Sequence, residues 1–254
     1  MSADEAPQAP GAHGGGSLPA PSYDSPGLKV WWHTVDFADP RFADAYRFGM
    51  EGARDFLLRR GAGPDVRHEW PVLVGCWAAW HAAHLPGDFV ECGTNTGLLS
   101  MAVCRYVDFN RLDKDFYLFD TYRGIPPEQI SDAEKRLGRE TLSRAVYREC
   151  YAETKRSFAG YPRVKLVRGR VPDTLRTVEI ELVCYLSIDM NVALPERAAL
   201  EHFWERLSPG APVLLDDYGK ARFIAQRRSA DEFARARGVK VLDLPTGQGL
   251  LLKP

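Results

Sequence analysis

Residues 88–97 read Asp88-Phe89-Val90-Glu91-Cys92-Gly93-Thr94-Asn95-Thr96-Gly97. The first five residues predict a short apolar strand, and the pattern after Gly97 predicts a helix over 98–106. Glycine in the turn between them lets the backbone bend sharply and approach a ligand beside a helix N-terminus. The G-x-x-x-G spacing matches neither the dinucleotide fingerprint nor the P-loop. Taken alone, the turn therefore indicates either tight packing or a bound cofactor.

The chain beyond this turn alternates strand with helix. Apolar runs predict six further strands, over 116–119, 164–167, 182–188, 213–215, 239–242 and 249–252. Amphipathic segments predict helices over 131–158, 195–207 and 223–237, the first of them opened by the capping pattern Ser131-x-x-Glu134. This alternation is typical of an α/β fold in which helices cover both faces of a mostly parallel sheet.

Three regions are distinguished along the sequence. Residues 1–27 are rich in proline and glycine and poor in apolar side chains, which predicts a disordered tail. Residues 28–86 are predicted to form a helical N-terminal extension, with helices over 42–57 and 70–84. Trp77 and Trp80 of the second helix are expected in the hydrophobic core. Residues 87–254 then form the main α/β domain.

Composition excludes several classes of protein. The chain has 254 residues, which suits one α/β domain with extensions. Its 33 Lys+Arg nearly balance 34 Asp+Glu, which argues against binding to nucleic acid or to an anionic membrane. The sequence shows neither an 18-residue apolar run nor a secretory signal, and its five cysteines lack disulfide or zinc spacing. We therefore expect a cytoplasmic protein with a small-molecule partner.

Asp120 is a second candidate for ligand binding. It ends the predicted strand over 116–119, downstream of the glycine-rich turn. An acidic residue at the tip of the second strand accepts hydrogen bonds from ribose hydroxyls in many nucleotide-binding sheets. The alternative is that Asp120 only starts a turn. The turn and Asp120 together favour a cofactor that contains a nucleoside.

Three aspartates follow two other apolar strands. Asp189 comes after 182–188, and Asp216 and Asp217 come after 213–215. Ligands of open α/β sheets bind at the carboxyl ends of the strands, and neighbouring strands lie about 4.8 Å apart. Three unpaired carboxylates would repel one another, whereas a hard cation such as Mg²⁺ or Mn²⁺ would hold them together. The alternatives are a polar turn at Asp216-Asp217 and a salt bridge at Asp189.

These motifs together resemble those of class I S-adenosylmethionine-dependent methyltransferases, and more narrowly those of the macrocin O-methyltransferase (TylF-like) family. The resemblance covers about residues 68–254. It rests on residues 88–97, on Asp120-Thr121-Tyr122 with Gly124-Ile125-Pro126, and on the turn Leu207-Ser208-Pro209-Gly210 before Asp216-Asp217-Tyr218-Gly219. It implies a Rossmann-like sheet of seven mostly parallel strands.

The resemblance also implies roles for individual residues. The donor S-adenosylmethionine would contact Glu91, Cys92, Gly93, Thr94, Asn95, Gly97, Asp120, Thr121, Gly169, Arg170 and Asp189. In this set the turn wraps the methionine part and Asp120 holds the ribose. Gly169 and Arg170 would lie beside the adenine, although Gly-Arg after a strand is also an ordinary turn. A metal would be held by Asp189, Asp216 and Asp217.

Asn191 departs from the pattern of the family. Many members carry Asp-x-Asp after the fourth strand, with the second Asp proposed as the general base, whereas this chain has Asp189-Met190-Asn191. An amide has no useful basicity, so Asn191 is left to ligate the metal or to hold the acceptor. The base would then be a metal-bound hydroxide, or the metal would lower the pKa of the acceptor hydroxyl. His68 is a further candidate for a catalytic residue. The alternative is that it is a surface residue or a satisfied core residue, which is the commoner role of a lone histidine.

The leading prediction is an S-adenosylmethionine-dependent O-methyltransferase that uses a divalent metal. Its acceptor would be a hydroxyl of a small molecule, such as a sugar moiety or another natural-product intermediate. The predicted catalytic residues are Asp189, Asn191, Asp217 and His68. Candidates for the acceptor side are Tyr218, Lys220, Gln226 and Gln248, each equally expected as a loop or capping residue.

Two other classes of function stay open. A nicotinamide-dependent oxidoreductase fits the alternation of strands and helices but lacks G-x-G-x-x-G. A non-catalytic binding protein is supported mainly by Asn191. The aromatic N-terminal helices either close the acceptor site or form a homodimer contact. The charge-rich stretch 136–156 is predicted to be a solvated helix face, with a role as a lid as the alternative.

Overall fold

A computed structural model describes residues 20–25, 27–31, 37–59, 61, 63 and 65–254 of the chain. Most of the predicted tail, residues 1–19 and 26, lies outside these ranges. Tyr23–Ser25 (β1) differ from a solvated tail, because they pair with Leu28–Val30 (β2) in an antiparallel hairpin. The hydroxyl of Tyr23 lies 2.9 Å from Glu69 Oε2 and 3.0 Å from the carbonyl oxygen of Arg67. Burial of the Tyr23 ring therefore fixes this short hairpin to the chain that precedes the main domain.

A seven-stranded sheet forms the centre of the described chain, in the order β5-β4-β3-β6-β7-β9-β8. Its strands are β3 (Asp88–Cys92), β4 (Phe116–Asp120), β5 (Val164–Arg168), β6 (Val183–Ile188), β7 (Pro212–Leu215), β8 (Leu242–Asp243) and β9 (Gly249–Leu252). The first five strands in that order are parallel, while β9 is antiparallel to both of its neighbours. The predicted fold class is confirmed, although the strand expected over 239–242 is only Leu242–Asp243.

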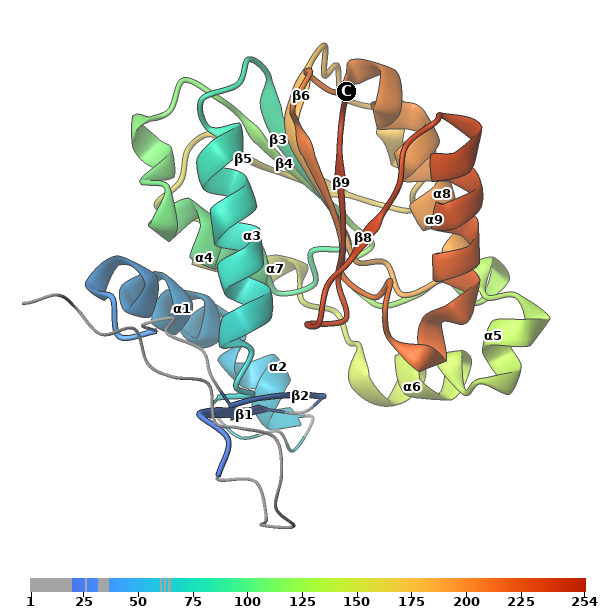
Figure 1. The fold of residues 1–254 in the computed structure, drawn as a ribbon, viewed down its shortest axis with the longest axis horizontal. Coiled ribbons are helices and arrows are strands. Elements are labelled where there is room, and N and C mark those ends of the chain that lie inside the picture. Colours follow the sequence, from blue (N-terminus) through green and yellow to red (C-terminus); the bar gives the residue numbers. More distant parts are fainter. Residues whose placement is uncertain (1–19, 26, 32–36, 60, 62, 64) are drawn as a thin grey trace, which may run out of the picture.

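Helices pack on both faces of the sheet (Figure 1). They are α3 (Glu69–Ala82), α4 (Leu98–Tyr106), α8 (Ala193–Phe203) and α9 (Ile224–Ala236). Phe89 and Tyr185 point into the core under α3 and α4, whereas Val90 and Leu186 point into the core under α8 and α9. Side chains alternate between the two faces of a strand, and all six residues of β6 are accordingly buried. This explains why the middle strands are apolar throughout.

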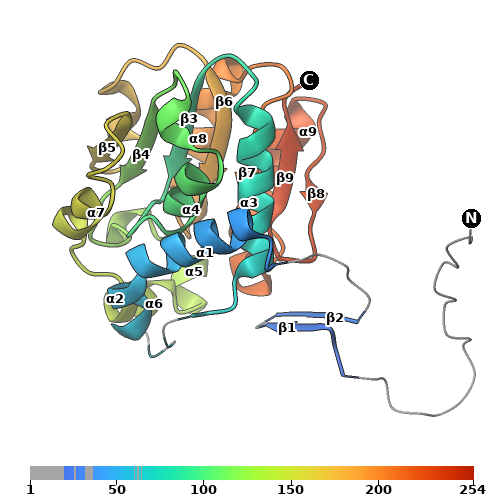
Figure 2. The ribbon, with the colours of Figure 1, turned by 90° about the vertical axis from the view of Figure 1, so that its left-hand side faces the viewer.

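The N-terminal extension is helical, as predicted. It contains α1 (Pro40–Gly52) and α2 (Arg54–Arg59), and Figure 2 shows α1 lying across α4. A Cβ atom at Gly49 would lie 2.5 Å from the carbonyl oxygen of Leu98, so the close approach of α1 and α4 depends on that glycine. The prediction that Trp77 and Trp80 are core residues is wrong, because 48% and 38% of their surface is exposed. Helix α3 buries its small residues instead, which lets it approach α4 and the sheet closely.

The predicted helix over 131–158 is divided into three. These are α5 (Asp132–Arg136), α6 (Arg139–Val146) and α7 (Tyr151–Ser157). The Ser131 and Glu134 side chains form the expected capping box at the start of α5. Gly138 in the left-handed region (φ 81°) then separates α5 from α6. Among the residues that the structure describes, no helix is both long and apolar enough to cross a membrane.

Candidate functional site

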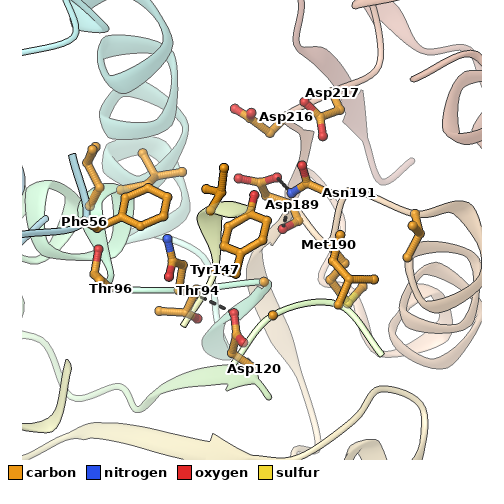
Figure 3. A pocket seen from close by; sticks show the side chains of 18 of the residues that line it. Phe56, Thr94, Thr96, Asp120, Tyr147, Asp189, Met190, Asn191, Asp216 and Asp217 are labelled. Atoms are coloured by element: carbon orange, nitrogen blue, oxygen red, sulfur yellow. Dashed lines mark hydrogen bonds between the residues drawn. The ribbon is translucent and has the colours of Figure 1, made fainter. Parts of the chain in front are cut away.

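One cavity of about 870 Å³ lies at the carboxyl ends of β3, β4, β6 and β7. The order of the strands places it at the switch point of the sheet, where the chain leaves β3 toward β4 on one side and returns to β6 on the other. Figure 3 shows Asp120 and Thr94 in one part of the cavity and the three other aspartates in another. The site thus has two polar regions, one at Asp120 and one at the other three aspartates.

The turn after β3 forms the first region. Gly93 and Gly97 have φ angles of 94° and 88°, and a Cβ atom at Gly93 would lie 2.0 Å from the carbonyl oxygen of Asp189. The Asp120 carboxylate accepts hydrogen bonds from the backbone N–H of Asn95 (2.7 Å) and of Tyr122 (2.6 Å). Burial raises the pKa of Asp120, and these hydrogen bonds oppose the rise. Asp120 therefore holds the turn in place and still faces the cavity.

The structure places most of the predicted donor residues on the cavity wall. They are Glu91, Gly93, Thr94, Asn95, Asp120, Thr121, Gly169 and Asp189. Cys92 is buried in the core under α8 and α9, and Gly97 packs against the Phe158 ring. The guanidinium of Arg170 turns outward to form exposed ion pairs with Glu128 and Asp173. These three residues do not line the cavity, so of the two residues predicted beside the adenine only Gly169 does.

Glu91 is a buried carboxyl group beside the turn. Burial raises its pKa from 4.5 to about 8, although the hydrogen bond from the Ser100 hydroxyl opposes this rise. Its ionised form is thus disfavoured in the folded protein at neutral pH. A positively charged ligand bound next to Glu91 would stabilise that ionised form.

We expect Glu91→Gln to stabilise the ligand-free protein more at pH 8.5 than at pH 5. Because the folded pKa lies above the unfolded one, the wild type loses stability as the pH rises from about 4.5 to about 8. The neutral amide does not ionise and avoids that loss. Thermal melts at the two pH values measure the effect, and Glu205→Gln, at a side chain 81% exposed, is the control. If the melting temperature of Glu91→Gln differed from that of wild type by the same amount at both pH values, ionisation of buried Glu91 would not be the cause.

The second region is the cluster of Asp189, Asp216 and Asp217. One carboxylate oxygen from each lies within 4.8 Å of the others. The ammonium of Lys220 donates to Asp216 Oδ2 (2.8 Å) and to Asp217 Oδ1 (3.0 Å). Gln248 Nε2 donates to Asp216 Oδ1 (3.2 Å) and also lies 3.4 Å from the carbonyl oxygen of Pro71. The parallel pairing of β6 and β7 thus brings the three acids together, as predicted.

The three carboxyl groups differ in their pKa shifts. Burial raises the pKa of Asp189 well above its usual range, and the charges of Asp216 and Asp217 raise it further. Burial also raises the pKa of Asp217, to about 6, against the attraction of Lys220. For Asp216 the effect of burial is outweighed by Lys220, His68 and Gln248, so that its pKa is lowered. The cluster is therefore short of positive charge, mainly at Asp189.

Asn191 lies beside this cluster in a supporting position. Its Nδ2 donates to Asp189 Oδ1 at 2.8 Å, and its backbone adopts a left-handed conformation (φ 64°). Asparagine tolerates that conformation better than most residues. An amide that donates to the carboxylate orients it and removes no proton. The structure thus places the Asn191 amide where it orients the carboxylate of Asp189.

His68 lines the same cavity, on the chain just before α3. Its backbone N–H donates to the Tyr46 hydroxyl (3.0 Å), which in turn donates to Asp65 Oδ1 (2.6 Å). Asp216 lines this cavity too, and the positive charge of His68 contributes to the lowered pKa of Asp216. The extension therefore contributes a titratable group to the site.

Other wall residues were not identified from the sequence. Phe56 of α2 stacks on Tyr147 after α6, with ring centroids 5.9 Å apart, and this pair forms an apolar wall. Arg139 is an exception to the prediction of a solvated face over 136–156, since most other charged residues of that stretch are exposed. It is 3% exposed, lies over the Phe223 ring at 3.8 Å and donates to the carbonyl oxygen of Arg222. Only contacts between distant segments reveal these roles.

The candidates for the acceptor side have different outcomes. Lys220 lines the cavity, and Gln248 bonds to Asp216 behind it. Tyr218 is buried and bonds to Asp231 Oδ1 (2.6 Å), and Gln226 is buried away from the cavity wall. Two of the four thus belong to the site.

Comparison with known proteins agrees with this geometry. A family model described as Macrocin-O-methyltransferase (TylF) matches residues 72–243. Mycinamicin III 3''-O-methyltransferase of Micromonospora griseorubida is 26% identical over 147 residues, which cover 53% of this chain and 56% of that protein. The chain thus matches little more than half the length of this relative.

Two solved structures share the fold. The O-methyltransferase NovP has a TM-score of 0.62 at 19% identity, over 72% of this chain and 79% of its own. The calicheamicin methyltransferase CalS11 has a TM-score of 0.61 at 17% identity, over 93% of this chain and 99% of its own. At these identities the likeness establishes the architecture of the sheet and its helices.

Proposed function

The chain belongs to the macrocin O-methyltransferase (TylF) family, and on that premise we propose that it transfers a methyl group from S-adenosylmethionine to a hydroxyl of a small molecule, with the help of a divalent cation. The observation that carries the proposal is one cavity that joins the glycine-rich turn and Asp120 to the three-aspartate cluster. Membership of this family also argues against the alternative of a nicotinamide-dependent oxidoreductase.

The donor end of the cavity suits a nucleoside with a cationic methionine part. Asp120 is positioned to accept from ribose hydroxyls, and the turn at Gly93 lets the backbone approach the ligand. Glu91, whose pKa is raised by burial, would ionise beside a positive ligand. These residues bind and orient the donor so that its methyl group faces the second region.

The chemical step forms a bond between the acceptor oxygen and the methyl carbon while the sulfur–carbon bond breaks. The electron pair stays on sulfur, and the hydroxyl proton must pass to a base. We assign that proton to His68, because Asn191 is not basic and His68 lines the same cavity as the three aspartates. His68→Asn should remove the acidic limb of the pH–rate profile and leave donor affinity unchanged. An unchanged limb would exclude His68 as the base.

The residues of the cluster fit a hard divalent cation. Their donor set is oxygen only, and Asp217 Oδ2 is a buried carboxylate oxygen without a hydrogen-bond partner among the described residues. Asp189, Asp216 and Asp217 would hold the ion. When bound, such an ion lowers the pKa of a coordinated hydroxyl and stabilises the developing alkoxide. Asn191 and Gln248 orient two of the carboxylates for that purpose.

The acceptor is proposed to be a natural-product intermediate with a hydroxyl, such as a sugar moiety. The relative from Micromonospora griseorubida is named for O-methylation of mycinamicin III at its 3'' position. The cavity of about 870 Å³ is large among ligand sites, which span roughly 300–1,000 Å³, and this suits two ligands side by side. The stacked rings of Phe56 and Tyr147 offer an apolar surface to the acceptor.

We expect Asp120→Ala to weaken the binding of S-adenosylhomocysteine about 100-fold. The change removes the acceptor for the ribose hydroxyls, where each hydrogen bond to a charged group contributes roughly 1.5–3 kcal/mol. Calorimetric titration measures the affinity, and Asp173→Ala, an exposed carboxylate near the adenine side, is the control. Wild-type protein that fails to bind the nucleoside would overturn the proposed activity. If Asp120→Ala bound the nucleoside with wild-type affinity, residues other than Asp120 would have to bind the ribose.

A further inference from the structure

Lys220 occupies a position that a cation would take in the acidic cluster. Its ammonium lies 2.8 Å from Asp216 Oδ2 and 3.0 Å from Asp217 Oδ1, so one charge bridges two of the three candidate ligands. The side chain of Asp217 is 5% exposed, so this contact is made inside the cavity wall. The two carboxylates that Lys220 contacts are two of the three that would bind a divalent ion.

The ammonium does not satisfy the cluster. Asp189 accepts from the neutral amide of Asn191, and no ion pair to Asp189 is seen in the described chain. Asp217 Oδ2 is buried and lacks a partner among the described residues. One ammonium cannot neutralise three ionised carboxylates, so full ionisation of the cluster in this poorly solvated place requires a cation of higher charge. A second observation besides the acids themselves therefore points to a cation of higher charge.

The lysine side chain has a route out of the site. It is 39% exposed. Its stem extends along Gly247, since a Cβ atom added to that glycine would lie 2.9 Å from Lys220 Cγ. Its ammonium is also 6.0 Å from the centre of the Phe223 ring, which lines the cavity. A long flexible side chain can leave the carboxylates by rotation about its own bonds, without movement of β7.

We propose that Lys220 is the resident cation of this site and that it competes with a divalent metal for Asp216 and Asp217. The inference rests on the proposed metal-assisted function and adds a determinant of metal affinity to it. Occupancy by one cation disfavours the other, because both draw on the carboxylates of Asp216 and Asp217 and their positive charges repel. The metal-free protein is thereby stabilised, and the affinity for the metal is reduced.

Binding of Mn²⁺ to the full chain tests this competition, with free Mn²⁺ measured by electron paramagnetic resonance. In Lys220→Met the charge is removed while the apolar stem beside Gly247 remains. We expect its dissociation constant for Mn²⁺ to fall at least about tenfold below wild type. Lys220→Arg keeps the charge and should stay within about threefold of wild type. Adding Asp189→Asn to Lys220→Met should abolish the gain, which locates the ion in the cluster.

The outcomes separate this inference from the proposed function. Binding by Lys220→Met without measurable binding by wild type would support the competition and remove the metal from the wild-type reaction. Lys220→Met that binds no more tightly than wild type, or Lys220→Arg that gains as much as Lys220→Met, would overturn the competition while metal assistance stands. Absence of Mn²⁺ binding in every variant would overturn both. As a second measurement, Mg²⁺ should raise the melting temperature of Lys220→Met more than that of wild type.

Discussion

Asp189→Asn is expected to lower kcat/KM for methyl transfer about 1,000-fold while the melting temperature of the metal-free protein stays the same or rises. The amide removes the carboxylate that burial and two neighbouring acids make hardest to ionise, so the folded protein loses an unfavourable charge. The same change removes a charged metal ligand at the centre of the site, and loss of several kcal/mol of transition-state stabilisation corresponds to this fall in rate.

Steady-state kinetics and thermal melts on the same preparation measure the two effects. Asp173→Asn, on the exposed surface, is the matched control and should change neither quantity. Because Asn191 can donate to the new amide oxygen, the loop after β6 should keep its shape. A variant that loses stability together with activity would show that Asp189 is structural, and one that keeps wild-type activity would exclude the cluster from the reaction.

Gly93→Ala is expected to cost the protein at least about 3 kcal/mol of stability and most of its affinity for the donor. The new Cβ atom would lie 2.0 Å from the carbonyl oxygen of Asp189 and 2.4 Å from its carbonyl carbon, both of them backbone atoms. The φ angle of 94° adds the strain of a left-handed conformation. The ends of β3 and β6 must therefore separate at the position where both regions of the site meet.

Gly138→Ala is a well-matched control for this substitution. Gly138 also has a positive φ angle (81°), but a Cβ atom there would meet nothing within 4 Å. It should cost only about 1 kcal/mol, which corresponds to a fall of roughly 2–4 °C in melting temperature. Gly93→Ala should melt at least about 6 °C lower than wild type or fail to accumulate as folded protein. Equal melting temperatures for the two variants would refute the argument from close approach.

Much of the fold was predictable because local pattern and global fold agree in the main domain. The apolar strands 183–188 and 212–215 end at acids, so Asp189 and Asp216 were placed at one sheet edge from sequence alone. The exposed tryptophans were not predictable, because a helix rich in small residues can bury either face. Trp80 lies under the Arg41 guanidinium at 4.4 Å, a contact between residues 39 positions apart.

Parts of the site were beyond sequence reasoning for a similar reason. The burial of Arg139 depends on Phe223, which is 84 residues later in the chain. The wall formed by Phe56 and Tyr147 joins α2 of the extension to the end of α6. Lys220 lies three positions after Asp217 in the sequence. Only the geometry of its side chain shows that it bridges Asp216 and Asp217. Charge-rich and aromatic segments carry no periodic signal that distinguishes a cavity wall from a solvated surface.

The hydrogen bonds of Gln248 have a consequence for the order in which the protein matures on the ribosome. Gln248 links Asp216 to Pro71 at the start of α3, and β9 directly after it pairs with β7 along its length. A nascent chain that ends before Gln248 contains all three aspartates but has neither this link nor the pairing of β9 with β7. Domains fold as their sequence is completed during synthesis, so β7 gains its second neighbour, and Asp216 its bond to Gln248, only after translation has passed Leu252. Until then β7 presents an open edge, which is a template for pairing with another chain.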